Sequence, residues 1–277
     1  MLRSTHCVNA CALHAWDVHV FDEVASTNLV VKDLIRSCAV PCQEKQADTL
    51  EDCPYFAAIS LCQTEGYGRQ GRSWSSPSGG LYASFGLPVP RTLISPLPTM
   101  SLVCSLAVKD VLDDLMVDRT CAIKWPNDIM VEGGKICGIS LESINAYLCV
   151  GIGLNVFHPE DDSIQSSYSV RYVSDYVDQA LAANRQLFFE QLVRNLIARL
   201  EEAFDQWCHE GFEPFKSRFE SCIAYRGSSV DLELIDGSTL VSGTIQGIDT
   251  EGRLRIDCAG EVRSFASGEV HLKKRAI

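Results

Sequence analysis

The glycine-rich stretch of residues 62–80, CQTEGYGRQGRSWSSPSGG, most strongly limits how this chain can fold. Residues 66–71 (GYGRQG) match the G-x-G-x-x-G pattern of dinucleotide-binding loops. In those loops a helix begins within the motif, because the pyrophosphate binds at the helix N-terminus. Here Pro77 and the Gly79-Gly80 pair follow, and they prevent a helix of useful length. The stretch therefore does not build a Rossmann-type site.

The same stretch joins two apolar runs that predict buried strands, YFAAISLC (55–62) and LYASFGLPV (81–89). Its glycines allow backbone amides to approach a ligand closely. Arg69 and Arg72 lie among them, and arginine offers paired donors to phosphate or carboxylate. Taken alone, the stretch fits an anion-binding loop and a solvated surface loop equally well.

Two further clusters lie at the ends of predicted strands. KWPND (124–128) places an amide and an acid after a Trp-Pro turn, and Lys135 follows seven residues after Asp128. GIGLN (151–155) brings two glycines and Asn155 to the end of another strand. Each cluster alone also fits a turn or a close strand crossing. Three of them at neighbouring strand ends favour one common site.

The sequence pattern changes near residue 225, from helical periodicity to short strands. Before it, apolar spacing predicts helices at 99–116 and 187–207. After it, short strands separated by turn signals such as Asp236-Gly237 predict a small β-barrel or sandwich. The net charge of −12 argues against broad nucleic-acid binding, and no apolar run reaches the roughly 18 residues of a membrane span.

The 13 cysteines bear on the compartment of the protein. The N-terminus lacks the apolar core of a secretory signal peptide. An odd number of cysteines without secretion predicts reduced thiols and a cytoplasmic protein, although organellar targeting of a fraction stays open. Residues 1–16 are expected to form a flexible tail.

Together, the clusters resemble biotin protein ligases of the short form without a DNA-binding domain. The matching pieces occur in the family's order and spacing: STN (26–28), Q-x2-G-x-G-R-x-G-R-x-W (63–74), KWPND (124–128), K-x2-G-I (135–139) and GIGLN (151–155). GxxxGID (243–249) and GEVHL (268–272) resemble the family's SH3-like domain. The resemblance covers about residues 17–275.

This resemblance implies an α+β fold with two domains. Residues 17–225 would form a catalytic domain of class II synthetase type, with helices on a mixed, mainly antiparallel sheet. Residues 226–277 would form a C-terminal SH3-like β-barrel.

The implied activity is an ATP-dependent ligation. The enzyme would activate biotin as biotinyl-5′-AMP and transfer it to a lysine of the biotin carboxyl carrier domains of carboxylases, with Mg²⁺ as cofactor. The expected partners include no DNA and no membrane, and a homodimer stays open. The alternatives are a lipoate or octanoate ligase on the same scaffold and a non-catalytic nucleotide-binding module.

The resemblance also implies roles for residues of this chain. The catalytic residues would be Lys135, Arg69 and Asp128. The biotin-binding residues would be Ser26, Thr27, Asn28, Gln63, Gly66, Gly68, Arg69, Lys135, Gly138 and Gly151. The ATP-binding residues would be Arg69, Arg72, Trp74, Lys124, Asn127, Lys135 and Asn155. No direct metal ligand is implied. Tyr67 stands where some relatives carry a basic residue that clamps the intermediate, so retention of the adenylate is expected to differ here.

Overall fold

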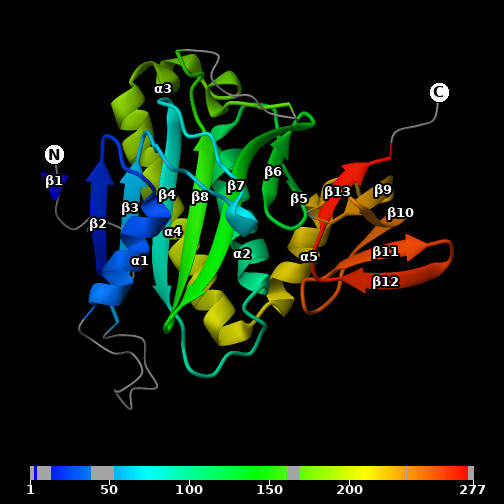
Figure 1. Cartoon of the computed structure of the whole chain (residues 1–277). Helices are drawn as coiled ribbons and strands as arrows, with labels where there is room; N and C mark the ends of the chain where they lie inside the picture. Colours follow the sequence, from blue (N-terminus) through cyan, green and yellow to red (C-terminus); the bar gives the residue numbers. More distant parts are fainter. Residues whose placement is uncertain (1–2, 5–13, 39–52, 161–168, 235, 274–277) are drawn as a thin grey trace.

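The computed structural model of the chain describes residues 3–4, 14–38, 53–160, 169–234 and 236–273. Its larger sheet has the order β1-β2-β3-β4-β8-β7-β6-β5 (Figure 1). Only β2 and β3 pair in parallel, so the sheet is mixed and mainly antiparallel, as implied. The strands are β1 (Arg3–Ser4), β2 (Trp16–Phe21), β3 (Tyr55–Ser60), β4 (Gly80–Pro88), β5 (Ala122–Lys124), β6 (Asp128–Val131), β7 (Gly134–Ile144) and β8 (Tyr147–Asn155).

Helices cover both faces of this sheet, which explains why β4 is buried along its whole length. On one face, α1 (Thr27–Ser37) packs Val31 and Ile35 against Phe56 and Tyr147. On the opposite face lie α2 (Thr99–Leu115) and α4 (Arg185–Glu210), which pack against each other (Figure 1). The remaining helices are α3 (Gln179–Ala183), α5 (Glu213–Cys222) and the 3-10 turns η2 (Arg69–Gly71) and η3 (Val173–Asp175).

The C-terminal segment forms a second, fully antiparallel sheet in the order β12-β11-β10-β9-β13. Its strands are β9 (Ser229–Glu233), β10 (Thr239–Ile248), β11 (Leu254–Cys258), β12 (Glu261–Phe265) and β13 (Glu269–Leu272). Residue 225, near which the pattern of the sequence changes, lies between α5 and β9. The inner side chains of this sheet, such as Leu232 and Ile256, belong to the same apolar cluster as α2 and α4.

The smaller sheet is fixed beyond the β5 edge of the larger one (Figure 1). Trp125 Nε1 donates to the carbonyl of Gly252 at 3.0 Å, and a Cβ on Gly252 would lie 2.8 Å from Leu102 on α2. Glu220 on α5 accepts from the amide of Ile248 at 3.2 Å. These contacts fix the end of β10 and the turn between β10 and β11 against Trp125, α2 and α5.

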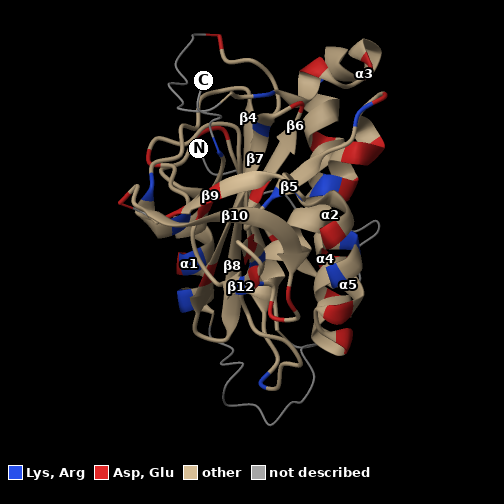
Figure 2. Cartoon of the chain, turned by 90° about the vertical axis from the view of Figure 1, so that its right-hand side faces the viewer, with Lys and Arg blue, Asp and Glu red and all other residues tan. Residues whose placement is uncertain are grey.

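The fold bears on membrane-spanning helices, on surface charge and on the start of the chain. No helix of the described ranges is long and apolar enough to cross a membrane. Acidic and basic residues are mixed along α4 and α5 (Figure 2). The expected tail lies mostly outside the described residues, but Arg3–Ser4 pairs with β2, which begins at Trp16.

The expectation of reduced thiols is wrong at one position, because Cys53 is disulfide-bonded. Cys104 and Cys137 are free thiols without exposed surface. Burial raises the pKa of Cys104 to about 12, so this thiol stays protonated and unreactive.

Candidate active site

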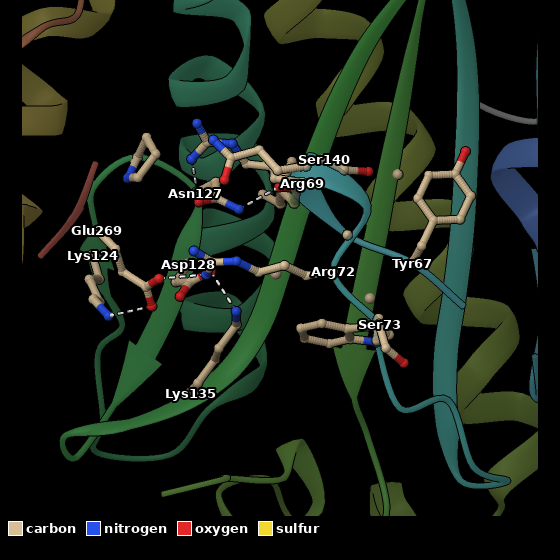
Figure 3. A pocket seen from close by; sticks show the side chains of 18 of the residues that line it. Tyr67, Arg69, Arg72, Ser73, Lys124, Asn127, Asp128, Lys135, Ser140 and Glu269 are labelled. Carbon is tan, nitrogen blue, oxygen red and sulfur yellow. Dashed lines mark hydrogen bonds and ion pairs between the residues drawn. The ribbon is translucent and has the colours of Figure 1, made fainter. Parts of the chain in front are cut away.

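A cavity of about 790 Å³ lies where the glycine-rich loop, the ends of β7 and β8, the turn between β5 and β6 and the smaller sheet meet (Figure 3). Ser26 and Gly66 are the only residues of the predicted site that do not line it. The predicted residues that line it are Thr27, Asn28, Gln63, Gly68, Arg69, Arg72, Trp74, Lys124, Asn127, Asp128, Lys135, Gly138, Gly151 and Asn155.

Glycines of β7 and β8 form the floor of the cavity. Gly138 and Gly153 are paired across these strands, and the Trp74 ring lies against both of them. A Cβ would lie 2.8 Å from the ring at Gly138 and 2.5 Å from it at Gly153. At Gly151 a Cβ would lie 2.4 Å from Asn28 Oδ1. Only glycine permits these close approaches.

One end of the cavity, which we call the neutral end, is lined by buried hydroxyl and amide groups. Gln63 Oε1 accepts from the amide and the hydroxyl of Thr27, at 2.8 and 3.1 Å. Ser84 Oγ lies 2.7 Å from Thr27 Oγ1 and 2.6 Å from Asn28 Oδ1. Asn28 Nδ2 donates to Ser140 Oγ at 3.4 Å. Since Thr27 and Asn28 form the first turn of α1, helix, loop and sheet share one network.

The other end, which we call the charged end, brings three cations and two carboxylates together (Figure 3). Lys135 Nζ lies 2.6 Å from Asp128 Oδ1. Glu269 of β13 accepts from Arg72 at 2.5 Å, and its second oxygen lies 3.9 Å from Lys124 Nζ. Burial raises the pKa of Glu269, but the bond from Arg72 and the nearby charge of Lys124 outweigh it and hold the pKa below its ordinary value. Glu269 is therefore ionised at neutral pH.

Arg69 adds a further cation, mostly withdrawn from water. Its Nη1 donates to Asn127 Oδ1 at 3.0 Å, and Asn127 is held in turn by two hydrogen bonds to the backbone of Ile139. Burial lowers the pKa of Arg69 from its ordinary value, but a guanidinium keeps its charge at any physiological pH. The turn after β5 thus orients one arginine toward the cavity.

Lys135 is the cation of the charged end that also lies against the glycine floor. Its Nζ is 4.9 Å from the centroid of the Trp74 ring, and its side chain passes beside Gly138. Asn155 Nδ2 donates to the carbonyl of Lys135 at 3.3 Å and fixes the backbone there. The arrangement can hold a neutral polar ring at one end and an anion at the other, with a cation where the two meet.

Among the lining residues to which the sequence gave no role, three take part in the polar contacts above: Ser84, Ser140 and Glu269. A serine in an otherwise apolar strand was the available signal for the first two. Glu269 lies in the GEVHL segment, which the sequence marked as a family motif without assigning it a role.

Comparison with protein families gives two matches within the chain. Residues 47–155 match the biotin/lipoate A/B protein ligase family, and residues 227–273 match the biotin protein ligase C-terminal domain. The second match covers the smaller sheet.

Individual proteins extend the similarity over most of the chain. The biotin–[acetyl-CoA-carboxylase] ligase of Mycobacterium tuberculosis is 30% identical over 257 residues, which are 91% of this chain and 89% of the relative. The bifunctional ligase/repressor BirA of Escherichia coli is 29% identical, over 78% of this chain and 66% of the relative. A solved structure of the biotin protein ligase of Aquifex aeolicus with biotin and ATP superimposes with a TM-score of 0.70. It is 25% identical and covers 93% of this chain and 98% of that one.

Proposed function

This chain belongs to the biotin protein ligase family, and on that basis we propose which of its residues bind biotin, bind ATP and promote the reaction. The protein is an ATP-dependent ligase that activates biotin as biotinyl-5′-AMP and transfers it to a carrier protein. The assignment of residues rests above all on one observation, the junction of a neutral and a charged end at Lys135 in a single cavity.

The neutral end suits the ureido ring of biotin, which has one carbonyl acceptor and two N–H donors. Thr27, Asn28 and Gln63 provide matching donors and acceptors that are already oriented by their mutual hydrogen bonds. Gly68, Gly138 and Gly151 let the rings approach the backbone. We keep Ser26 and Gly66 as proposed biotin-site residues that act through the first turn of α1 and the base of the loop, since neither lines the cavity.

The charged end suits ATP. Arg69, Arg72 and Lys124 would neutralise phosphate oxygens, and Trp74 would offer its ring to the adenine, with Asn127 and Asn155 beside the nucleotide. Arg72 and Lys124 would exchange the carboxylate of Glu269 for phosphate.

The first step joins the two ligands. A biotin carboxylate oxygen attacks the α-phosphorus, a P–O bond to the β-phosphate breaks, and pyrophosphate leaves. Two anions must approach each other, and Lys135 and Arg69 would lower that barrier electrostatically. In the second step the lysine amine of the carrier attacks the acyl carbon and AMP leaves, while Asp128 would orient the amine.

Mg²⁺ belongs to the proposal as well. The described residues contain no group of three or more metal-binding side chains. Magnesium is usually bound by one or two carboxylates together with substrate phosphates, and Asp128 offers one carboxylate in the cavity. Bound there, the ion would neutralise part of the phosphate charge.

The acceptor would be the biotin carboxyl carrier domain of carboxylases. The absence of DNA binding, a cytoplasmic location and the state of association, including a homodimer, stay predictions from the sequence. A lipoate ligase is disfavoured, because the C-terminal sheet matches the domain of biotin ligases.

Isotope exchange between pyrophosphate and ATP tests this proposal. Exchange should depend on biotin and not on lipoate, and it should need no carrier protein. Exchange that depends on lipoate, or that is absent with both acids, would contradict the assignment.

A further inference from the structure

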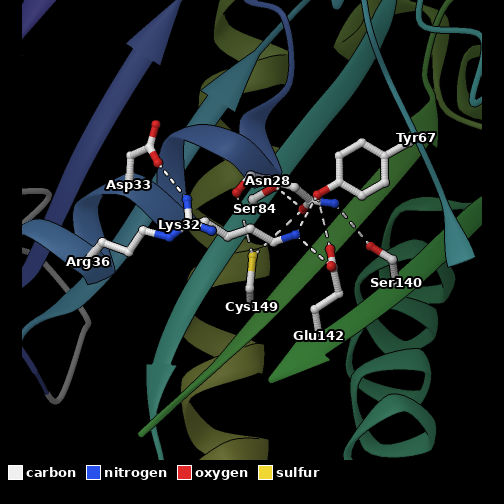
Figure 4. Close-up of polar contacts among 9 residues, drawn as sticks. All are labelled: Asn28, Lys32, Asp33, Arg36, Tyr67, Ser84, Ser140, Glu142 and Cys149. Carbon is white, nitrogen blue, oxygen red and sulfur yellow. Dashed lines mark hydrogen bonds and ion pairs between the residues drawn. The ribbon is translucent and has the colours of Figure 1, made fainter. Parts of the chain in front are cut away.

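Tyr67, on the glycine-rich loop, contacts two residues that lie outside the cavity lining (Figure 4). Its hydroxyl accepts from Lys32 Nζ at 2.8 Å and donates to Glu142 Oε1 at 3.1 Å. Lys32 Nζ also donates to Glu142 Oε2 at 2.5 Å, and it lies 5.2 Å from the centroid of the Tyr67 ring. The three side chains thus close a ring of hydrogen bonds, which we call the loop latch.

Each member of the loop latch comes from a different element. Lys32 lies on α1, one turn after Asn28, and Glu142 lies on β7, two residues after Ser140. The latch therefore ties the loop to the same helix and strand that carry the neutral end.

The charge states of these groups fit this ring of bonds. Burial lowers the pKa of Lys32, but its bonds to Glu142 and Tyr67 outweigh burial and raise the pKa above its ordinary value. Burial, together with the charge of Glu142, raises the pKa of Tyr67. At neutral pH the lysine is therefore charged and the tyrosine keeps the proton that it donates.

The side chains of the rest of the loop contact the cavity, since Arg69 donates to Asn127 and Arg72 donates to Glu269. Between Gly66 and Trp74 its backbone bonds are internal, as in Gly68 to Arg72 and Trp74 to Gly66, and they join the two halves of the loop to each other. Tyr67 is thus the loop residue that is bonded to α1 and β7, through two partners outside the cavity lining. The Lys32 side chain is 14% exposed and the Glu142 side chain 37%, so the lysine end of the ion pair is shielded from water.

We propose that Tyr67, Lys32 and Glu142 hold the glycine-rich loop over the cavity before any ligand binds, so that they set how fast the adenylate leaves. Lys32 and Glu142 are positioning residues that act through Tyr67. This inference rests on the proposed function only in naming the adenylate as the ligand retained.

The test compares adenylate release by Tyr67→Phe and Lys32→Met with two matched controls. Tyr176→Phe removes a tyrosine hydroxyl that donates to Glu132 at 3.2 Å. Lys109→Met removes a lysine that is 15% exposed and paired with Asp113 on α2. Both control pairs lie outside the cavity lining.

Each enzyme would be loaded with radiolabelled biotin and ATP, freed of unbound ligand and chased with unlabelled biotinyl-AMP. We expect release to be about tenfold faster in both latch variants and unchanged in both controls. The double variant should resemble the faster single variant, because the two changes break one interaction. Release within about twofold of wild type, or additive effects of the two changes, would overturn the proposal.

A second measurement needs no ligand. Amide hydrogen exchange over residues 66–74 of the free protein should be about tenfold faster in Tyr67→Phe than in Tyr176→Phe. A lower thermal stability with unchanged release and exchange would show a merely structural role and overturn the latch. If wild-type protein forms no biotin-dependent adenylate, the proposed function fails, while the exchange measurement still decides whether the latch holds the loop.

Discussion

The two ends of the cavity differ in how much of their bonding is completed before a ligand arrives. At the neutral end, Thr27, Asn28 and Gln63 are bonded to one another or to serines within the larger domain. At the charged end, Arg72 and Lys124 face Glu269, a carboxylate of the smaller sheet. The polar groups of the neutral end are held by hydrogen bonds within the protein. The cations of the charged end are paired with carboxylates that a ligand must replace.

This difference suggests how the two ligands gain affinity. A ligand at the neutral end finds oriented partners and pays little to order them. An anion at the charged end must replace a carboxylate, so its affinity reflects an exchange of charges and depends on ionic strength. Four experiments test whether the two ends differ in this way.

The largest effect should follow Lys135→Ala at the junction of the two ends. The substitution removes a cation that is 9% exposed, at the position where we propose that carboxylate meets phosphate. Loss of one such stabilising contact costs about 3–4 kcal/mol, or roughly a hundred- to thousandfold in the rate of adenylate formation. Biotin-dependent pyrophosphate exchange measures this, with Lys109→Ala as a control.

The same variant should be supplied with synthetic biotinyl-AMP to follow transfer to a carrier domain, which separates the two steps. Adenylate formation by Lys135→Ala at the wild-type rate would remove the central residue from the assignment.

A smaller effect, confined to the neutral end, is expected for Gly151→Ala. The new methyl group would lie 2.4 Å from Asn28 Oδ1 and 2.5 Å from Ser140 Oγ, so their hydrogen bonds must shift. Losing two or three such bonds, at about 1 kcal/mol each, should raise the KM for biotin roughly 30- to 150-fold. The KM for ATP serves as the internal control. A parallel rise in both constants would show that the ends are not independent.

Salt should act mainly on the charged end. Raising KCl from about 0.05 to about 0.5 M shortens the screening length and should raise the KM for ATP roughly three- to tenfold. The KM for biotin, which brings a single charge, should change less than about twofold. Equal salt dependence of the two constants would contradict the division into a neutral and a charged end.

The smallest effect concerns the contact between the two sheets. Because the pKa of Glu269 is lowered in the folded state, its ion pairs stabilise the fold above the ordinary value of 4.5, and this contribution is lost as pH falls through the lowered pKa. Glu269→Gln should therefore lower the free energy of unfolding by about 0.5–1 kcal/mol at pH 7. The difference should shrink below pH 4.5. Urea unfolding at several pH values measures it, with Glu261→Gln on the exposed face of β12 as a control.

Much of the secondary structure could be predicted from local patterns. The helix expected at 99–116 is Thr99–Leu115, because its apolar positions continue without a glycine or proline. The helix expected at 187–207 extends from Arg185 to Glu210, because Asn184 caps its start and Gly211 ends it. Its fully buried positions include Phe188 and Phe204.

The strand order could not be predicted from the same patterns. The parallel pairing of β2 with β3 and the place of β4 beside β8 depend on contacts between distant segments, which periodicity does not report. The resemblance to a family implied only that the sheet is mixed and mainly antiparallel.

The site divides in the same way. Arg69, Asp128 and Lys135 stand in compact motifs, so their chemistry could be predicted locally. Arg72 and Glu269 are 197 positions apart, so local sequence patterns do not predict their contact. Lys32 lies outside every motif, so its contacts with Tyr67 and Glu142 could not be predicted either. Ser84 and Ser140 are buried serines, and a serine gives no sign of whether its partner is a side chain or the backbone.

The floor made by Gly138, Gly151 and Gly153 has a consequence for how such an enzyme can change over evolutionary time. The floor is made of backbone and offers no side chain that mutation could replace. At each of the three glycines even a methyl group would collide with a neighbouring side chain. A lineage that came to accept a different acid would have to alter the walls, at Ser84, Ser140 or the glycine-rich loop, while the floor stayed the same.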